Sequence, residues 1–232
     1  MAMGAVHAVG VPERLVVARY GFAEADRLAR VKAGTSKRWT RGYSYQSAAG
    51  ERVTKPPVSK AEASTAAAVS FADLVEVAAI HGLRDLGFSL AQIRRIVESC
   101  QELFDSDRPL LSHRFKADGR DAFVQGDDGV LVSVLRGKRR TAWDDVLDPF
   151  LATVDYQDGW AHRWWPEGRS KQVVIDPDYG YGLPVVAGTG VRTEILLERS
   201  EAGESIVEIA DDFGVSIESV RDALQFERAL AA

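Results

Sequence analysis

The chain has 232 residues, 46% of them hydrophobic, which is enough to bury one large core or two to three small ones. Its single cysteine, Cys100, excludes an internal disulfide framework, and its four scattered histidines form no CxxC or HxxxH pattern, so no metal site is expected. Residues 1–11 lack the features of a secretion signal, and no run of about 18 apolar residues occurs. We therefore expect a cytoplasmic protein with no membrane partner.

The formal net charge of −5 hides an asymmetry between the two ends of the chain. Residues 1–60 carry eleven Lys and Arg against four Asp and Glu, a net of +7, whereas residues 171–232 carry five against twelve, a net of −7. A basic surface suits DNA, because neutralising phosphates releases counterions. A charged run is more commonly just a solvated face, but here the basic run coincides with a binding motif.

That motif begins at Phe22, where apolar residues recur at helical spacing up to Ala29. A turn over residues 31–35 and a short basic helix over 35–41, with Trp39 pointing inward, complete a predicted helix-turn-helix. The Ser-, Gly- and Pro-rich residues 42–68 predict a wing or a mobile loop. The candidate DNA-binding residues are Lys32, Thr35, Ser36, Lys37, Arg38, Arg41, Tyr43, Arg52 and Lys55. The alternative is an ordinary basic helical hairpin.

Two longer helices are expected next, with Ser70 and Ser89 as their N-caps. They are expected to pack against the first motif and complete a winged helix-turn-helix domain over residues 1–110. Between about residues 114 and 137, short apolar runs broken by Asp-Gly turns predict a small antiparallel sheet, in a segment of sheet and aromatic linker over residues 111–170. Trp160, Trp164 and Trp165 in this segment serve either packing between domains or an exposed partner site.

The sharpest pattern lies near the C-terminus, where Ser205 and Glu208 form a capping box and Gly214 permits a tight turn. It predicts a three-helix helix-turn-helix domain over residues 171–232. The second helix of this motif carries three acids against two bases, so we expect it to serve packing or dimerisation rather than DNA reading. The candidate dimerisation residues are Val220, Leu224 and Phe226.

The fold class expected from these elements is α+β, mainly α. Adjacent acid pairs such as Asp127 and Asp128 have no basic partner in a motif, so no catalytic residues are assigned and no enzyme is expected. The glycine-rich residues 180–190 lack the spacing of a phosphate-binding loop, so no cofactor is expected.

Two resemblances add to this interpretation. The helix-turn-helix, the wing-like loop and the helices that contain Phe71-Ala72-Asp73-Leu74-Val75 and Gly87-Phe88-Ser89-Leu90-Ala91-Gln92-Ile93-Arg94 resemble the DNA-binding domain of MerR-type regulators, over roughly residues 15–105. Residues 175–177, 183–192 and 202–210 resemble the small helix-turn-helix domain of antitoxins encoded beside PIN-like ribonuclease toxins, although Gly190 stands where that family commonly has arginine. The combination is similar to VapB-like antitoxins with a MerR-like front end.

The resemblance implies a type II antitoxin that binds operator DNA as a homodimer, autoregulates its operon and neutralises a PIN-like ribonuclease toxin. A basic residue inserted at the carboxylate-held metal of such a toxin would inhibit it. The candidate toxin-binding residues are Arg136, Lys138, Arg139 and Arg140, and their alternative role is a solvated strand end. The domain over residues 171–232 is expected to serve dimerisation, toxin binding or both. Two other functions stay open: a stand-alone MerR-type transcription regulator with a sensing middle region, and an interaction scaffold without DNA affinity.

Overall fold

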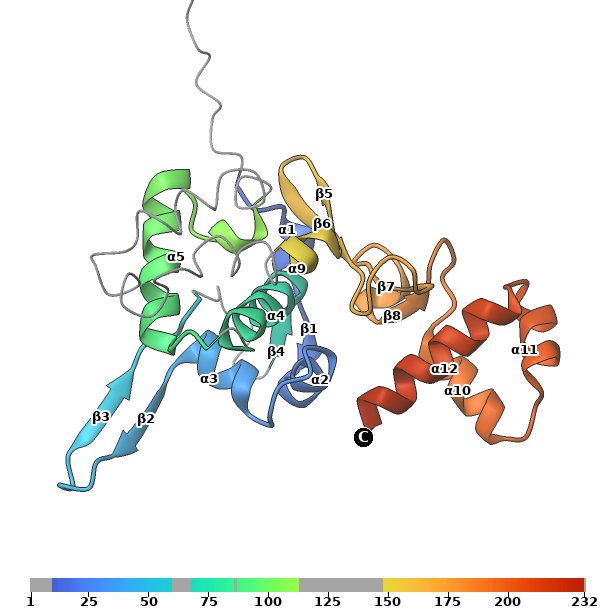
Figure 1. The fold of residues 1–232 in the computed structure, drawn as a ribbon, viewed down its shortest axis with the longest axis horizontal. Coiled ribbons are helices and arrows are strands. Elements are labelled where there is room, and N and C mark those ends of the chain that lie inside the picture. The colour runs from blue at the N-terminus through green and yellow to red at the C-terminus, as the bar shows by residue number, and fades with distance from the viewer. Residues whose placement is uncertain (1–9, 60–67, 86, 113–147, 232) are drawn as a thin grey trace, which may run out of the picture.

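The computed structural model describes residues 10–59, 68–85, 87–112 and 148–231 (Figure 1). About half of these residues are helical, and the strands form small antiparallel sheets, so the expected α+β class is confirmed at that level. The sheet predicted over residues 114–137 lies outside the described residues. No helix of the described part is long and apolar enough to cross a membrane.

The N-terminal elements form a helical body from which one hairpin projects (Figure 1). They are α1 (Glu13–Val16), β1 (Ala18–Gly21), α2 (Phe22–Leu28), α3 (Thr35–Arg41), β2 (Tyr43–Gln46), β3 (Arg52–Lys55), β4 (Ala68–Ser70), α4 (Phe71–Asp85), α5 (Leu90–Phe104) and the 3-10 helix η1 (Pro109–Leu111). Strand β1 pairs with β4, and β2 pairs with β3. The projecting hairpin is β2–β3.

Helix α4 lies at the centre of this body, and its first ten residues are all buried. Its start is fixed by Ser70 and Asp73, whose side chains and backbone N–H groups bond each other reciprocally at 2.9 and 3.1 Å. Two buried carboxylates, Asp73 and Glu76, share the guanidinium of Arg108 at 2.9 Å each. The predicted cap Ser89 is also confirmed, because it forms a capping box with Gln92 at the start of α5.

The remaining elements form a four-stranded sheet and a group of three helices (Figure 1). They are α9 (Asp148–Ala152), β5 (Val154–Gln157), β6 (Trp160–Trp164), β7 (Val173–Ile175), the 3-10 helix η3 (Gly180–Gly182), β8 (Pro184–Val186), α10 (Thr193–Glu201), α11 (Ile206–Phe213) and α12 (Ile217–Ala231). The sheet order is β5-β6-β7-β8, with each neighbouring pair antiparallel.

One buried hydrophobic cluster contains residues from all three predicted domains, 1–110, 111–170 and 171–232. It contains Tyr20 from β1, Trp160 and Trp164 from β6, and Phe226 from α12. The hydroxyl of Tyr20 donates to the carbonyl of Gly182 at 2.5 Å, in a buried position. Packing is therefore the role of Trp160 and Trp164. A second, smaller cluster lies between β8 and the helices α10, α11 and α12 and includes Leu196, Ile209, Val220 and Leu224.

Candidate nucleic-acid interface

The orientation of α3 is set by one buried carboxylate on α2. Asp26, 4% exposed, accepts hydrogen bonds from the backbone N–H groups of Gly34 at 2.5 Å and Ser36 at 2.7 Å. These groups begin the helix and have no partners within it, so Asp26 serves as its N-terminal cap from a neighbouring helix. Gly34 has a φ of +75°, which glycine adopts without strain. Helices α2 and α3 are thereby held as a helix-turn-helix.

The inner face of α3 is buried against the body. Trp39 is 8% exposed, as predicted, and its carbonyl accepts from the N–H of Val58 at 2.7 Å. Ser36 is fully buried, and its hydroxyl donates to the carbonyl of Phe22 at 3.1 Å. The assignment of Ser36 to DNA binding was therefore wrong, because its side chain is used in packing α3 on α2. Thr35 is 7% exposed, and its hydroxyl accepts from Arg38 at 3.0 Å.

The outer face of α3 and the turn before it carry exposed cations. Lys32, Lys37 and Arg38 are all exposed, and the Lys37 ammonium lies 5.9 Å from the centre of the Phe22 ring. Arg41 lies at the end of the helix and is half-buried, because it donates to the carbonyl of Ala68 at 3.0 Å. The structure thus brings Lys32, Lys37 and Arg38 together on α3 and the turn preceding it. The hydrogen bond of Arg41 instead holds β4 against α3.

The β2–β3 hairpin presents two different faces. The register pairs Tyr43 with Lys55 and Tyr45 with Val53, so these four side chains share one face, and the two tyrosine rings stack with centroids 6.1 Å apart. Arg52 pairs with Gln46, and these two side chains lie on the other face of the hairpin. Tyr43 and Lys55 are half-buried, whereas Arg52 is exposed and Tyr45 is 46% exposed.

The base of the hairpin is held close to the end of α3. Gly42 has a φ of +73°, and a Cβ there would lie only 2.5 Å from the carbonyl oxygen of Lys55. Arg94 of α5 donates to the carbonyls of Pro56 at 2.7 Å and Pro57 at 3.3 Å. Sequence reasoning missed Tyr45, Arg94 and Asp26 as contributors to this surface. The alternation of side chains over residues 43–46 and 52–55 was the available signal for the hairpin.

The C-terminal helices α11 and α12 form the second helix-turn-helix. Ser205 and Glu208 make the predicted capping box, with bonds of 2.9 and 3.3 Å, and Gly214 adopts a φ of +63°. Because the Ser205 bonds favour the ionised carboxylate, the pKa of Glu208 is lowered. The proposed dimerisation residues Val220, Leu224 and Phe226 are 0, 3 and 0% exposed within the single chain. Their assignment to a dimer seam was wrong, since the chain's own core already covers them.

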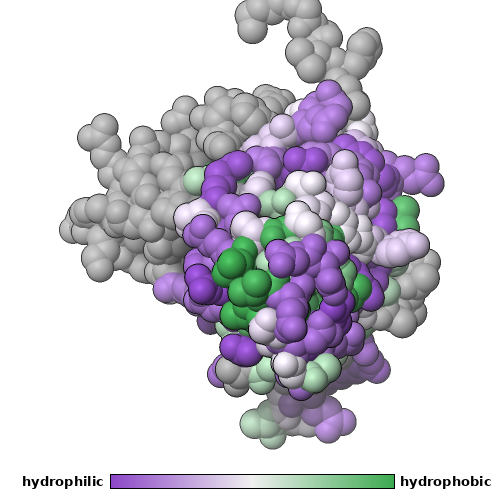
Figure 2. All heavy atoms as spheres, turned by 90° about the vertical axis from the view of Figure 1, so that its right-hand side faces the viewer, coloured by the Kyte–Doolittle hydropathy of each residue, from purple (hydrophilic) through white to green (hydrophobic). Residues whose placement is uncertain are grey.

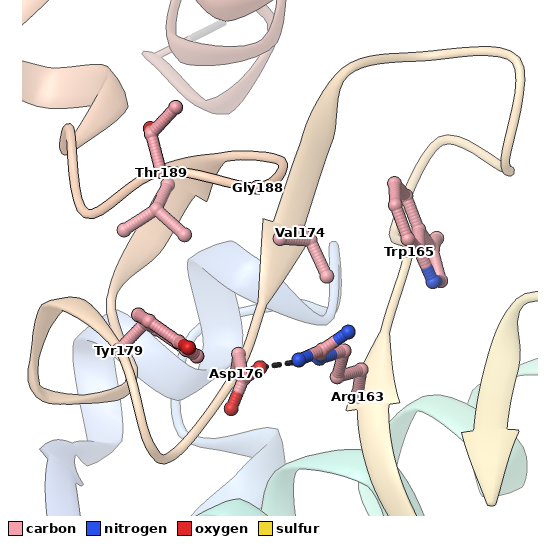
Figure 3. A pocket seen from close by; sticks show the side chains of 8 residues that line it. Arg163, Trp165, Val174, Asp176, Tyr179, Gly188 and Thr189 are labelled. Carbon is pink, nitrogen blue, oxygen red and sulfur yellow. Dashed lines mark hydrogen bonds and ion pairs between the residues drawn. The ribbon is translucent and has the colours of Figure 1, made fainter.

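A small pocket of about 90 Å³ lies between β6, β7 and the loop after β8, lined by residues including Arg163, Trp165, Tyr179 and Thr189 (Figure 3). Pockets that hold drug-sized ligands are roughly 300–1,000 Å³, so this one is too small for the sensing role considered for the middle region. Arg163 points across it and pairs with the buried Asp176.

Next to this pocket, His162, Asp176 and Asp178 lie close enough to hold a cation. However, Arg14 lies 3.1 Å from Nδ1 of His162 and 3.3 Å from the carboxylate of Asp178, and Arg163 pairs with Asp176. A metal ion would have to displace two guanidinium groups, so this cluster is an ion-pair network that connects α1 to the sheet. The candidate toxin-binding residues Arg136, Lys138, Arg139 and Arg140 lie outside the described residues.

Two family models match separate parts of the chain. Residues 18–97 match a family described as "Putative DNA-binding HTH domain", and residues 173–226 match "Protein of unknown function (DUF433)". A DNA-binding type of helix-turn-helix domain is thus followed by a DUF433 domain.

Two curated proteins of Mycobacterium tuberculosis (strain ATCC 25618 / H37Rv) are similar over most of the chain. "Putative antitoxin VapB45" is 28% identical, covering 91% of this chain and 94% of that protein. "Uncharacterized protein Rv2308" is 24% identical, covering 90% of each. The crystal structure of Rv2018 from Mycobacterium tuberculosis has the same fold, with a TM-score of 0.67 and 22% identity over 90% of this chain and 98% of that one.

Proposed function

We propose that this protein is a non-enzymatic regulator: a DNA-binding antitoxin that reads its operator through α2–α3, with the β2–β3 hairpin as a wing. One observation carries the DNA-binding part of this proposal. Lys37 and Arg38 are exposed on the outer face of α3, while Asp26 and Trp39 fix the position of its inner face. Guanidinium and ammonium groups on a rigid helix are the donors that contact base edges and phosphates in the major groove.

The wing extends the same surface beyond the helix. Arg52 and Lys55 lie on opposite faces of a two-stranded ribbon that projects from the body (Figure 1). A ribbon of this kind fits in a groove or against the adjacent phosphates, and the exposed ring of Tyr45 adds apolar contact there. We also propose a homodimer, since readers of this type match a pseudo-palindromic operator with half-sites one helical turn or multiples apart. Its seam lies elsewhere than Val220, Leu224 and Phe226.

The antitoxin part of the proposal rests on likeness to a named protein along most of the chain. "Putative antitoxin VapB45" aligns with 91% of it and over 94% of its own length. We propose that the partner is a PIN-like ribonuclease toxin encoded beside this chain, and that operator binding autoregulates the operon. A stand-alone transcription regulator is the alternative if the adjacent reading frame encodes no binding partner.

The DNA-binding proposal is tested by the double charge reversal K37E/R38E. Affinity for a duplex from immediately upstream of its own gene should fall at least about thirtyfold, because two direct contacts of about 1 kcal/mol or more each are lost. The slope of log K against log salt concentration should also fall by about two. Fluorescence anisotropy at several salt concentrations measures both quantities.

The matched control is R221E/R228E, which makes the same charge change on exposed residues of α12. Its affinity should stay within about threefold of the wild type, since neither residue lies on α3 or the β2–β3 hairpin, which carry the proposed DNA contacts. Equal losses in both variants would mean that only overall charge matters. A larger loss in the control would identify the C-terminal motif as the DNA reader and overturn the proposal.

A further inference from the structure

The C-terminal helix-turn-helix has apolar side chains where a DNA reader needs polar ones. In a motif that binds DNA, the first helix crosses the phosphate backbone and the first residues of the second helix contact base edges. At these two places the chain has Val207, 53% exposed, and Ile217, 40% exposed. Neither side chain can donate a hydrogen bond to a phosphate or a base. Both nevertheless remain in contact with water.

The same two helices and the turn between them carry three more apolar residues that are not fully buried. Ile206, Phe213 and Val215 are partly buried and pack against the cluster beneath α11 and α12. Figure 2, which views the end of the molecule formed by α10–α12, shows hydrophobic atoms gathered in a patch with hydrophilic atoms around it. A contiguous apolar patch with a polar rim is typical of a surface that binds another protein.

The charges around the patch select the kind of partner. Residues 206–221 contain four acids and one base, a net of −3. The nearby Arg199 is already bound, because it pairs with Glu204 and Asp212 and lies 5.4 Å from the centre of the Phe213 ring. An acidic rim repels DNA. A second copy of the chain on the same patch would place two acidic rims against each other, since such contacts are self-complementary.

We propose that the exposed apolar surface of α11 and the start of α12, which includes Val207 and Ile217, is the surface on which the toxin docks. The partner it fits has an apolar centre and a rim of Lys and Arg. A protein that cuts RNA has to present basic side chains to its polyanionic substrate, so a ribonuclease fits that description. The inference rests on the proposed antitoxin function and names the surface that performs the neutralising contact. The apolar centre contributes most of the affinity, and the acidic rim accelerates association.

The test uses the full chain and the purified product of the reading frame next to its gene. V207K and I217K each place a charge in the apolar centre and should weaken binding at least about thirtyfold, as expected for central contact residues. V17K is the matched control, since Val17 is 43% exposed and lies between α1 and β1, outside the C-terminal helices. Its affinity should stay within about threefold, because a peripheral charge contributes little. Isothermal titration calorimetry gives the affinities, and urea denaturation checks that each variant folds.

A second pair of variants keeps the test valid if a lysine in the apolar centre disturbs the fold. D211K and E218K change only exposed rim residues, and they should slow association and reduce its salt dependence. Unchanged toxin affinity in V207K, I217K and both rim variants would overturn the inference and leave the antitoxin function standing. Failure of the wild type to bind the adjacent product would overturn both. Sedimentation that shows V207K splitting a wild-type dimer, with toxin affinity unchanged, would assign the patch to a second copy instead.

Discussion

Removal of the Asp26 carboxylate should have two effects: the protein becomes less stable, and the start of α3 shifts. In D26A the N–H groups of Gly34 and Ser36 lose bonds of 2.5 and 2.7 Å, of which the first is partly buried and the second buried. Each unsatisfied buried donor costs about 1–3 kcal/mol, and the variant regains part of this because the carboxylate no longer has to be desolvated. We expect the free energy of unfolding to fall by roughly 2–4 kcal/mol, a large share of the 5–15 kcal/mol typical of a folded domain.

D26N separates the two bonds. Its amide has one oxygen to accept a hydrogen bond, but its NH₂ group faces the other N–H, so roughly half of the loss is expected. Promoter affinity should fall more in D26N than this modest destabilisation explains, because the start of α3 shifts. Urea denaturation with a shared m-value measures the stabilities, and E98A, an exposed acid on α5, is the control with a change within about 0.5 kcal/mol. Equal stability of D26N and the wild type would refute the capping role.

Two further predictions concern the buried carboxylates and the hairpin. Burial raises the pKa of Glu76 from 4.5 to about 7, against the attraction of Arg108, so the native state keeps a proton that the unfolded chain loses between these values. The free energy of unfolding should therefore fall by up to roughly 3 kcal/mol as pH rises from about 4.5 to 7. The variant E76Q should show a flatter pH profile. If the urea midpoints at pH 5 and pH 8 differ as much in E76Q as in the wild type, the prediction is contradicted. G42A should lower promoter affinity and stability more than G87A, because both glycines have a positive φ but only at position 42 does a Cβ meet backbone. Equal effects of the two substitutions would show that strain at φ, and not the contact with Lys55, limits the hairpin.

Features governed by three- or four-residue spacing could be predicted from the sequence. The capping boxes at Ser89 and Ser205 and the turn at Gly214 depend only on close neighbours, and the structure has them where the pattern places them. The inward direction of Trp39 follows from the same helical periodicity.

Features that depend on distant parts of the chain could not be predicted. Ser36 resembles a surface residue in a basic run, and its burial results from Asp26 and Phe22 on another helix. The periodicity of α12 indicates that Val220 and Phe226 face inward, but it does not say what covers them. Phe226 packs in the cluster that contains Tyr20, more than two hundred positions earlier, and no local pattern encodes that pairing.

The shared hydrophobic cluster also determines which fragments of the chain can fold on their own. Phe226 and Leu230 of the last helix lie in the same cluster as Leu15 and Tyr20. A fragment that ends at residue 110 or 170 would expose apolar side chains that α12 covers, so it would aggregate or unfold rather than report the affinity of an intact DNA reader. We therefore expect the two helix-turn-helix regions to unfold together, so their separate roles have to be measured with surface substitutions in the whole chain.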